Sequence, residues 1–368
     1  MSRAKYIRPS SAATWVACSG SIDMRAMFPA APDEADSEVT DDGTACHWLA
    51  AELWEGRHHA EGTLAPNGRV LTDEMFDACD LYHDVLRSWG EAVPVCEKSI
   101  PIDRILQGLT GTPDAFAYNP TLKRLYIADL KFGFRFVEVW DNWQMICYAV
   151  GLLDLLGLWD QDVTIEFVIV QPRSSHRDGP VRKWVCKLAD IIGHINVLIL
   201  AARRETQYVP NPGCGDCPGR HVCVALQNSA LTALERAYQG DPFELSPAAL
   251  GDELRRLKDA AKKLEARVTG LETQAESMLR NGKQVNGWTL APSYARETWK
   301  EGGEQRILTL AHLQGVNAAK PMRAMTPNQL RKVLPSSLVA MFAHKPSTGV
   351  RLTKVDPYEA RKAFQQPP

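Results

Sequence analysis

The sequence predicts an α/β protein in which a central mixed sheet is flanked by helices. Three observations lead to this prediction. Between residues 93 and 133 the apolar segments are short, rich in β-forming residues and interrupted by Gly, Pro and Asn. The run VTIEFVIVQP at residues 163–172 has the continuous apolar character of a buried strand. Around these segments, apolar residues recur at the three- and four-residue intervals of amphipathic helices.

The N-terminal part of the chain favours helices. The expected elements are a short capped helix at 9–28, a polar loop at 31–42, a helix at 41–56 and a helix at 72–91. The first of these helices carries Trp15 and Cys18. The second, DDGTACHWLAAELWEG, begins at an acid or at Thr44, which can cap it, and ends at Gly56.

The middle of the chain changes from helical to strand periodicity and back. The expected elements are an antiparallel meander of 93–102, 108–119 and 124–133, a helix at 139–157, a buried strand at 163–172 with a neighbouring strand at 181–188, and a helix from about 189 to 205. This alternation places the predicted sheet between predicted helices.

The C-terminal third is different in character. Residues 247–281 are rich in Ala, Leu, Lys, Glu and Arg at helical spacing, which fits a helical arm, one strand of a coiled coil, or an amphipathic helix packed on its own domain. Residues 281–300 fit a hairpin. We therefore expect three regions: a main domain at 1–225, a linker with a helical arm at 226–282, and a small mixed region at 283–368.

The overall composition is that of a globular protein. The chain has 368 residues, 45% of them hydrophobic, and a formal net charge of −2, so a nucleic-acid site would have to be a local basic groove. No signal-peptide pattern and no apolar run of about 20 residues is found. We expect a cytoplasmic protein, in the bacterial host cytoplasm if a phage encodes it. Nine cysteines in such a chain do not indicate a disulfide framework.

Asp114, Asp129 and Lys131 lie on segments predicted to be strands, where an unpaired charge is costly. Asp129 and Lys131 project to the same side of a strand because they are two residues apart, and strand pairing would bring Asp114 near them. Two carboxylates can hold Mg²⁺ or Mn²⁺, and a lysine beside them can stabilise developing charge, a combination suited to phosphodiester hydrolysis. The structural alternative is a salt bridge at a sheet edge.

Three further side chains fit such a site. Gln144 and Tyr148 lie four residues apart on the helix that follows Lys131, so both face one side of it. The alternative is a core tyrosine beside one polar residue. His47 on the second predicted helix is a candidate metal ligand, although a single helical histidine is more often a packing or surface residue. Glu97 is a candidate acid that would support the metal ligands without contacting the metal, or a strand surface charge.

A cluster of cysteines indicates a second metal site. Cys214, Cys217 and Cys223 lie within ten residues in a loop rich in Gly and Pro. A closed zinc site or an iron–sulfur cubane needs a fourth ligand. Cys18 is the favoured candidate, and His221 is the local alternative, which would favour zinc. The other cysteines lie in apolar periodic segments and are expected in the core: Cys46, Cys79, Cys96, Cys147 and Cys186.

The order of these motifs resembles the RecB-like branch of the PD-(D/E)XK nuclease superfamily. The resemblance rests on His47, the GTPD motif ending at Asp114, DLK at 129–131, QxxxY at 144–148 and the C-terminal cysteines. It is closest to iron–sulfur members such as AddB-type domains and CRISPR-adaptation nucleases, and to a phage and prophage nuclease family. It covers roughly residues 9–225.

The resemblance implies a restriction-endonuclease-like core, a metal-dependent DNA exonuclease activity and a role in processing DNA ends for phage recombination or replication. It assigns His47, Asp114, Asp129 and the carbonyl of Leu130 to the catalytic metal. Lys131 would be the catalytic lysine, with Gln144 and Tyr148 positioning the DNA. A [4Fe–4S] cluster on Cys18, Cys214, Cys217 and Cys223 would join the two ends of the main domain. A shorter Asp129 stands where many members carry glutamate.

The implied partner is DNA, either single-stranded or at duplex ends, together with a recombinase or a single-strand-binding protein, and no membrane. Candidate contacts to the DNA are basic and aromatic residues: Lys123, Arg124, Arg135, Arg173, Arg177, Trp15, Phe134 and Trp143. The alternative function is a non-catalytic DNA-binding or assembly protein that keeps the nuclease fold, with a structural zinc or iron–sulfur site.

Overall fold

The computed structural model describes residues 3–28, 38–174, 176, 178–238 and 246–290. The chain divides into two units, Met1–Thr289 and Leu290–Pro368. All elements named below belong to the first unit. Within the described residues no helix is both long and apolar enough to cross a membrane.

A mixed five-stranded sheet forms the centre of the first unit. Its strands, in spatial order, are β1 (Val95–Cys96), β4 (Ala115–Asn119), β5 (Arg124–Leu130), β6 (Thr164–Val170) and β7 (Val181–Lys187). All neighbours are antiparallel except β5 and β6, which are parallel. Parallel neighbours need a crossover, and α6 (Trp143–Leu155) provides it. A separate two-stranded ribbon pairs β2 (Ile100–Pro101) with β3 (Thr110–Gly111).

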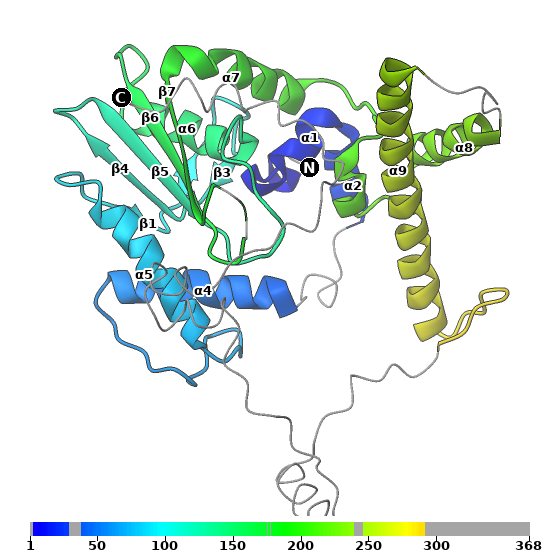
Figure 1. Cartoon of the computed structure of the whole chain (residues 1–368), viewed down its shortest axis with the longest axis horizontal. Coiled ribbons are helices and arrows are strands. Elements are labelled where there is room, and N and C mark those ends of the chain that lie inside the picture. The colour runs from blue at the N-terminus through cyan, green and yellow to red at the C-terminus, as the bar shows by residue number, and fades with distance from the viewer. Residues whose placement is uncertain (1–2, 29–37, 175, 177, 239–245, 291–368) are drawn as a thin grey trace, which may run out of the picture. The chain divides into compact units, whose positions relative to one another are not determined.

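Helices cover both faces of this sheet (Figure 1). One face carries α4 (Glu38–Trp54) and α5 (Asp73–Arg87), which pack on alternate residues of the central strands, including Ala128 and Leu130. The other face carries α6 and α7 (Leu188–Arg203). The β5 side chains between these layers are almost all buried, so a polar residue on β5 needs partners.

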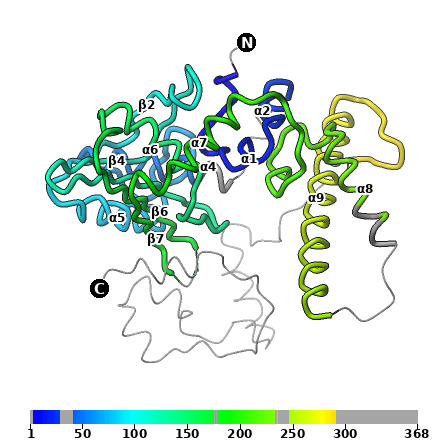
Figure 2. Tube along the Cα trace, turned by 90° about the horizontal axis from the view of Figure 1, so that it is seen from above, coloured from blue at the N-terminus to red at the C-terminus, as the bar shows by residue number. Residues whose placement is uncertain are grey.

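The N- and C-terminal segments of the first unit complete the fold. They comprise the 3₁₀ turns Arg3–Tyr6, Pro9–Ser11 and η3 (Pro212–Asp216), and the helices α1 (Ala12–Ala17), α2 (Gly20–Met27), α8 (Val224–Tyr238) and α9 (Pro247–Arg280). Helix α1 contacts both α6 and α7, and Figure 2 shows it beside α7.

Several sequence predictions are confirmed. The helices expected at 72–91, 139–157 and 189–205, and the neighbouring strands at 163–172 and 181–188, are all present with shifted ends. The antiparallel order of β1, β4 and β5 is also as expected. The long helix at 247–281 packs one side on α8 and η3, where Ala266 and Gly270 are buried.

Other expectations need correction. The single helix expected at 9–28 is two helices, because Cys18 between them is extended, with φ −142° and ψ 95°. The loop expected at 31–42 gives way to helix α4 at Glu38, and residues 31–37 lie outside the described part. The long strands expected at 93–102 and 108–119 are fragments, since Glu97 turns the chain at φ 48° and Pro113 lies between β3 and β4. Of the hairpin expected at 281–300, the described part holds one antiparallel bridge, Val285 to Trp288.

Candidate functional site

Asp114, Asp129 and Lys131 meet where β4 begins and β5 ends. Because Ala115 pairs with Ala128 in antiparallel register, the preceding Asp114 is brought beside the end of β5. Its Oδ2 accepts a hydrogen bond from the Leu130 N–H at 2.6 Å. The sequence predicts Asp114 within a strand. In the structure Asp114 directly precedes β4. Lys131 Nζ lies 2.8 Å from Asp129 Oδ2, as expected for side chains on one side of a strand.

Helix α6 delivers Gln144 to this ion pair. Gln144 Nε2 donates to Asp129 Oδ1 at 2.8 Å, and Gln144 Oε1 accepts from Lys131 Nζ at 3.2 Å. Gln144 Nε2 is also 3.1 Å from the hydroxyl of Tyr148, one turn later. The helix begins at this point because the Asn142 side chain accepts the N–H groups of Gln144 and Met145. The Asn142 cap thus fixes the start of α6 and with it the position of Gln144 beside Asp129 and Lys131.

Helix α4 brings His47 to the other side of Asp114. His47 Nδ1 is 3.3 Å from Asp114 Oδ1 and 3.8 Å from Glu97 Oε1. One ligand atom from each of these three residues lies within 4.8 Å of the other two. Glu97 reaches this position through its left-handed turn, and its N–H donates to the Asp114 carbonyl at 3.1 Å. Asp129 lies on the other side of Asp114, toward Lys131 and Gln144.

The charges of this site are strongly coupled. Burial lowers the pKa of His47, but Asp114 and Glu97 outweigh it and raise that pKa to about 10. Burial also raises the pKa of Asp129 to about 6, helped by Asp114 and opposed by Lys131. For Lys131, burial acts downward on the pKa, and the two aspartates outweigh it and raise the pKa. The carboxylates therefore favour positive charge at their centre.

A pocket opens beside this site and contains a polar group without a partner. His47, Glu97, Asp114 and Leu130 line the pocket, together with Tyr82 from α5. Tyr82 is 3% exposed, and its hydroxyl has no hydrogen-bond partner among the described residues. A buried hydroxyl without a partner is costly. Sequence reasoning missed Tyr82, because a tyrosine on the apolar side of an amphipathic helix is indistinguishable from a core residue.

These residues fit a divalent cation. Asp114, Glu97 and Asp129 supply three carboxylates, whereas Lys131 supplies one ammonium group, which leaves an excess of two negative charges when His47 is neutral. Carboxylate oxygens and one imidazole are ligands that Mn²⁺ accepts, and Mg²⁺ takes mainly the oxygens. The partnerless Tyr82 hydroxyl adds a group that a ligand in the pocket would satisfy.

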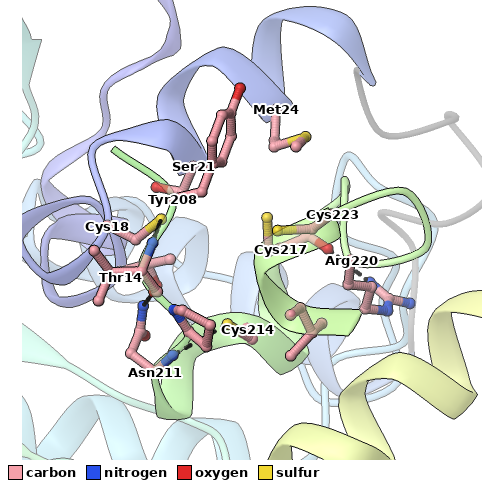
Figure 3. Close-up of a pocket in the computed structure, with 13 residues that line it drawn as sticks. Thr14, Cys18, Ser21, Met24, Tyr208, Asn211, Cys214, Cys217, Arg220 and Cys223 are labelled. Carbon is pink, nitrogen blue, oxygen red and sulfur yellow. Dashed lines mark hydrogen bonds between the residues drawn. The ribbon is translucent and has the colours of Figure 1, made fainter. Parts of the chain in front are cut away.

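The four cysteines expected to share a metal line one cavity. Cys18 comes from the break between α1 and α2, whereas Cys214, Cys217 and Cys223 come from the loop around η3. In Figure 3 the side chains of these residues surround a common space. Backbone N–H groups of Val209 and Asn211 lie 3.4 and 3.3 Å from the sulfurs of Cys18 and Cys214. Donors aimed at sulfur are a feature of metal–thiolate sites.

His221, the alternative ligand, is placed differently. It does not line the cavity, and its Nδ1 lies 3.1 Å from the Pro218 carbonyl oxygen. Its ring packs edge-on against Phe28 at 4.9 Å. Of the five cysteines expected in the core, four are buried and Cys96 is half-buried.

The candidate DNA contacts are widely separated. Lys123 and Arg124 lie at the start of β5, about 20 Å from its other end at roughly 3.3 Å per residue. Trp15 is 1% exposed and unavailable for stacking. The guanidinium of Arg173 packs on the rings of Phe132 and Phe134 and pairs with Glu74 at 2.9 Å, so it is a packing residue. Arg177 lies outside the described residues.

Three candidates remain near the site. Phe134 is 65% exposed and follows Lys131 by three residues. Arg135 is exposed and pairs with Asp216 of the cysteine loop at 3.2 Å. Trp143, beside Gln144, is half-buried and packs against His194.

The fold and the site define a mixed α/β protein with an acidic, cation-compatible centre at the end of its middle strand. A family model described as "Protein of unknown function (DUF2800)" matches residues 6–342. The match spans most of the 368 residues, and the chain belongs to this family. Among solved structures, the chain is similar to a phage-related exonuclease from Haemophilus somnus 129PT. That similarity has 13% identity and a TM-score of 0.23, and covers 54% of this chain and 91% of that one.

Proposed function

We propose that this protein is a metal-dependent DNA exonuclease with a RecB-like PD-(D/E)XK core. The observation that carries the proposal is the continuous set of contacts from His47 and Glu97 through Asp114 to Leu130, and from Asp129 to Lys131 and Gln144. A structural salt bridge at a sheet edge would not require a second acid, a histidine and a glutamine on the same buried centre.

The side chains suit distinct roles in phosphodiester hydrolysis. A Mg²⁺ or Mn²⁺ ion would supply Lewis-acid chemistry and activate water, with His47, Glu97 and Asp114 holding it; the family resemblance adds Asp129 and the Leu130 carbonyl. Lys131 places a fixed positive charge beside the scissile phosphate and stabilises the charge that develops there. Gln144 fixes the Lys131 ammonium, and Tyr148 fixes Gln144.

The cysteine cavity suits a [4Fe–4S] cluster better than zinc. Cys18 and the three clustered cysteines line one space, while His221 is turned to a carbonyl oxygen. Four thiolates serve either metal, and the split origin of the ligands is the pattern of the iron–sulfur nucleases that the sequence resembles. The cluster would hold α1 and α2 against the C-terminal loop and would have a structural role.

The decisive experiment is a time course on end-labelled single- and double-stranded DNA with Mg²⁺ and Mn²⁺. We expect shortening of the DNA by wild type, and a loss of at least 100-fold in rate for Lys131→Ala and Asp129→Ala. Lys123→Ala is the matched control, because this lysine adjoins the opposite end of β5, and it should keep wild-type activity.

Intact DNA under all of these conditions, with a full metal complement, would exclude the enzyme. If DNA still binds in that case, the alternative of a non-catalytic DNA-binding or assembly protein takes its place. Internal cuts in circular DNA would show an endonuclease in place of an exonuclease.

The metal in the cysteine cavity is identified by anaerobic purification and visible spectroscopy. A [4Fe–4S] cluster absorbs broadly near 400 nm, whereas zinc is silent, since its d shell is full. We expect Cys18→Ala to remove this absorbance and Cys186→Ala, a buried thiol elsewhere, to retain it. A colourless protein with stoichiometric zinc would rule out the iron assignment.

A further inference from the structure

Helix α9 carries an apolar stripe with the seven-residue repeat of a coiled coil. Leu or Met recurs at every seventh residue, at the positions conventionally called d, and Leu, Ala or Val stands four residues after each of the first four d residues, at the a positions. The d residues are Leu250, Leu257, Leu264, Leu271 and Met278, and the a residues are Leu254, Ala261, Val268 and Ala275. A repeat sustained over four to five heptads is typical of a coiled-coil strand.

The structure leaves most of this stripe facing solvent. Leu250, Leu257, Val268, Leu271 and Met278 are between 38% and 55% exposed. Isolated exposed leucines are common on protein surfaces, but a stripe along a 34-residue helix is about 50 Å long at 1.5 Å per residue. Such a continuous apolar surface indicates an interaction site.

The opposite side of α9 is the one that attaches the helix to its own chain. Ala266 is buried there, and a Cβ added at Gly270 would lie 3.0 Å from the backbone nitrogen of His221. Arg267 reaches the carbonyl oxygens of Arg220 and His221 from this side. The helix is therefore anchored to the cysteine loop through one side, while the heptad stripe points away from that anchor.

We propose that the stripe pairs with the same stripe of a second copy of this chain as a parallel, two-stranded coiled coil. A heptad stripe is self-complementary, because each a or d residue meets its own counterpart across a two-fold axis. Leucine at four of the five d positions, with the β-branched Val268 at one a position, is compatible with two strands. This proposal does not depend on the proposed nuclease activity.

The charges beside the stripe favour a second copy in parallel register. In that register, a residue at position g meets the residue five places later on the other helix, at position e. Glu253 then meets Lys258 of the second copy. Arg267 stands opposite Glu272 of the second copy, but the Arg220 and His221 carbonyls of its own chain hold its guanidinium, so this position adds no ion pair. The two remaining pairs, Ala260 with Glu265 and Gln274 with Leu279, bring no like charges together.

The test is the mass of the full chain in solution, measured by light scattering and sedimentation equilibrium. Wild type should be a dimer of the 40.9 kDa chain, and Leu257→Lys with Leu271→Lys should be a monomer with unchanged circular dichroism. Both leucines are more than 40% exposed, so the variant is expected to fold. Val93→Lys, at a 78% exposed position away from α9, should remain a dimer.

A second pair of variants tests the orientation. Lys258→Glu should weaken the dimer several-fold, since it brings Glu253 and residue 258 of the two copies together with like charge, and adding Glu253→Lys should restore it. A monomeric wild type overturns the proposal. A double-lysine variant that stays dimeric, or Lys258→Glu without effect, also overturns it.

Discussion

At the scale of single residues, the Tyr82 hydroxyl stands out because it is buried beside His47, Glu97 and Asp114 and has no hydrogen-bond partner in the part of the chain that the structure describes. Most buried polar atoms in proteins are hydrogen-bonded, so an unpaired one points to a ligand or to a cost in stability. A phenol at this position can donate to a phosphate oxygen in the pocket.

We expect Tyr82→Phe to keep the fold or to stabilise it by up to about 1 kcal/mol, because the unpaired hydroxyl is removed. If the hydroxyl contacts the substrate, the rate of DNA hydrolysis falls about tenfold, because one hydrogen bond of roughly 1.4 kcal/mol is lost. Chemical denaturation and the nuclease time course measure the two effects separately. A fall in stability with unchanged rate would show that the hydroxyl only supports packing.

The sequence alone pointed to most of the site because chemistry-bearing residues broke the apolar pattern. Asp114, Asp129 and Lys131 are charges among apolar neighbours, and the structure brings them together with His47, Gln144 and Tyr148. Their roles stay predictions. The sequence could not show that Glu97 lies beside His47 and Asp114, because its side chain reaches them through a left-handed backbone turn. Trp15 and Arg173, two of the candidate DNA contacts, are packing residues, which the sequence could not show because burial of an aromatic or an arginine depends on tertiary packing.

At the scale of elements, the loop between β5 and α6 is held by one buried side chain. Gln171 is fully buried, and its Nε2 donates to the carbonyls of Gly133 and Arg135 at 2.9 and 2.7 Å. Its Oε1 accepts from Val137 N and from Arg182 Nη2. The exposed ring of Phe134 therefore stands on a fixed backbone, directly after Lys131.

We expect Gln171→Leu to lower the free energy of unfolding by about 2–4 kcal/mol, because several buried groups lose their partners at once. Gln161→Leu is the matched control: Gln161 is exposed and accepts only a 3.3 Å bond from Tyr118 among side chains, so less than about 0.5 kcal/mol should be lost. Urea titration measures both. Equal stabilities of the two variants would contradict the role given to Gln171.

Two glycines on α9 allow a comparison within one helix. A Cβ at Gly270 would meet Arg220 Cγ at 2.6 Å and His221 N at 3.0 Å, whereas a Cβ at Gly251 meets nothing within 4 Å. We expect Gly251→Ala to stabilise by about 0.5–1 kcal/mol through helix propensity. Gly270→Ala should destabilise by about 1–3 kcal/mol through overpacking. Thermal unfolding that ranks them in the reverse order would contradict this docking.

Helices and strands were predicted well where the apolar repeat extends over many residues. They were predicted poorly where a few residues determine where an element ends. The helices at 73–87, 143–155 and 188–203 and the strands β6 and β7 follow directly from their apolar spacing. The break at Cys18 has only a weak local signal, the Ser19-Gly20 pair that follows it. It is imposed by contacts with distant residues, for example the Gly20 N–H to the Gln207 carbonyl at 2.9 Å. No local pattern contains that information.

At the scale of the whole first unit, the cysteine cavity joins segments about 200 positions apart. Cys18 lies opposite Cys214, Cys217 and Cys223, and Ser19 and Arg3 donate to the carbonyls of Glu205 and Arg204. A metal that bridges such distant segments stabilises the folded state strongly, because binding free energy is added to folding free energy.

We expect Cys18→Ala, or removal of the metal by a chelator, to lower the melting temperature by at least 5 °C at a cost of a few kcal/mol. Hydrogen exchange should increase in α1 and α2 and in residues 205–223, while β5 and β6 stay protected. Cys147→Ala, a buried thiol of α6, is the control for simple loss of volume. An equal loss of hydrogen-exchange protection over the whole sheet would show that the cysteine cavity does not act only on the two segments that it joins.

The distance along the chain between Cys18 and its partners also sets an order of events during synthesis. Helices α1 and α2 leave the ribosome before the carbonyls and cysteines of the later segment that they contact, which follow roughly 190 residues later. At about 5–20 residues per second, α1 and α2 wait for about 10–40 s for these contacts. The two helices therefore complete their packing only when residues 205–223 have emerged.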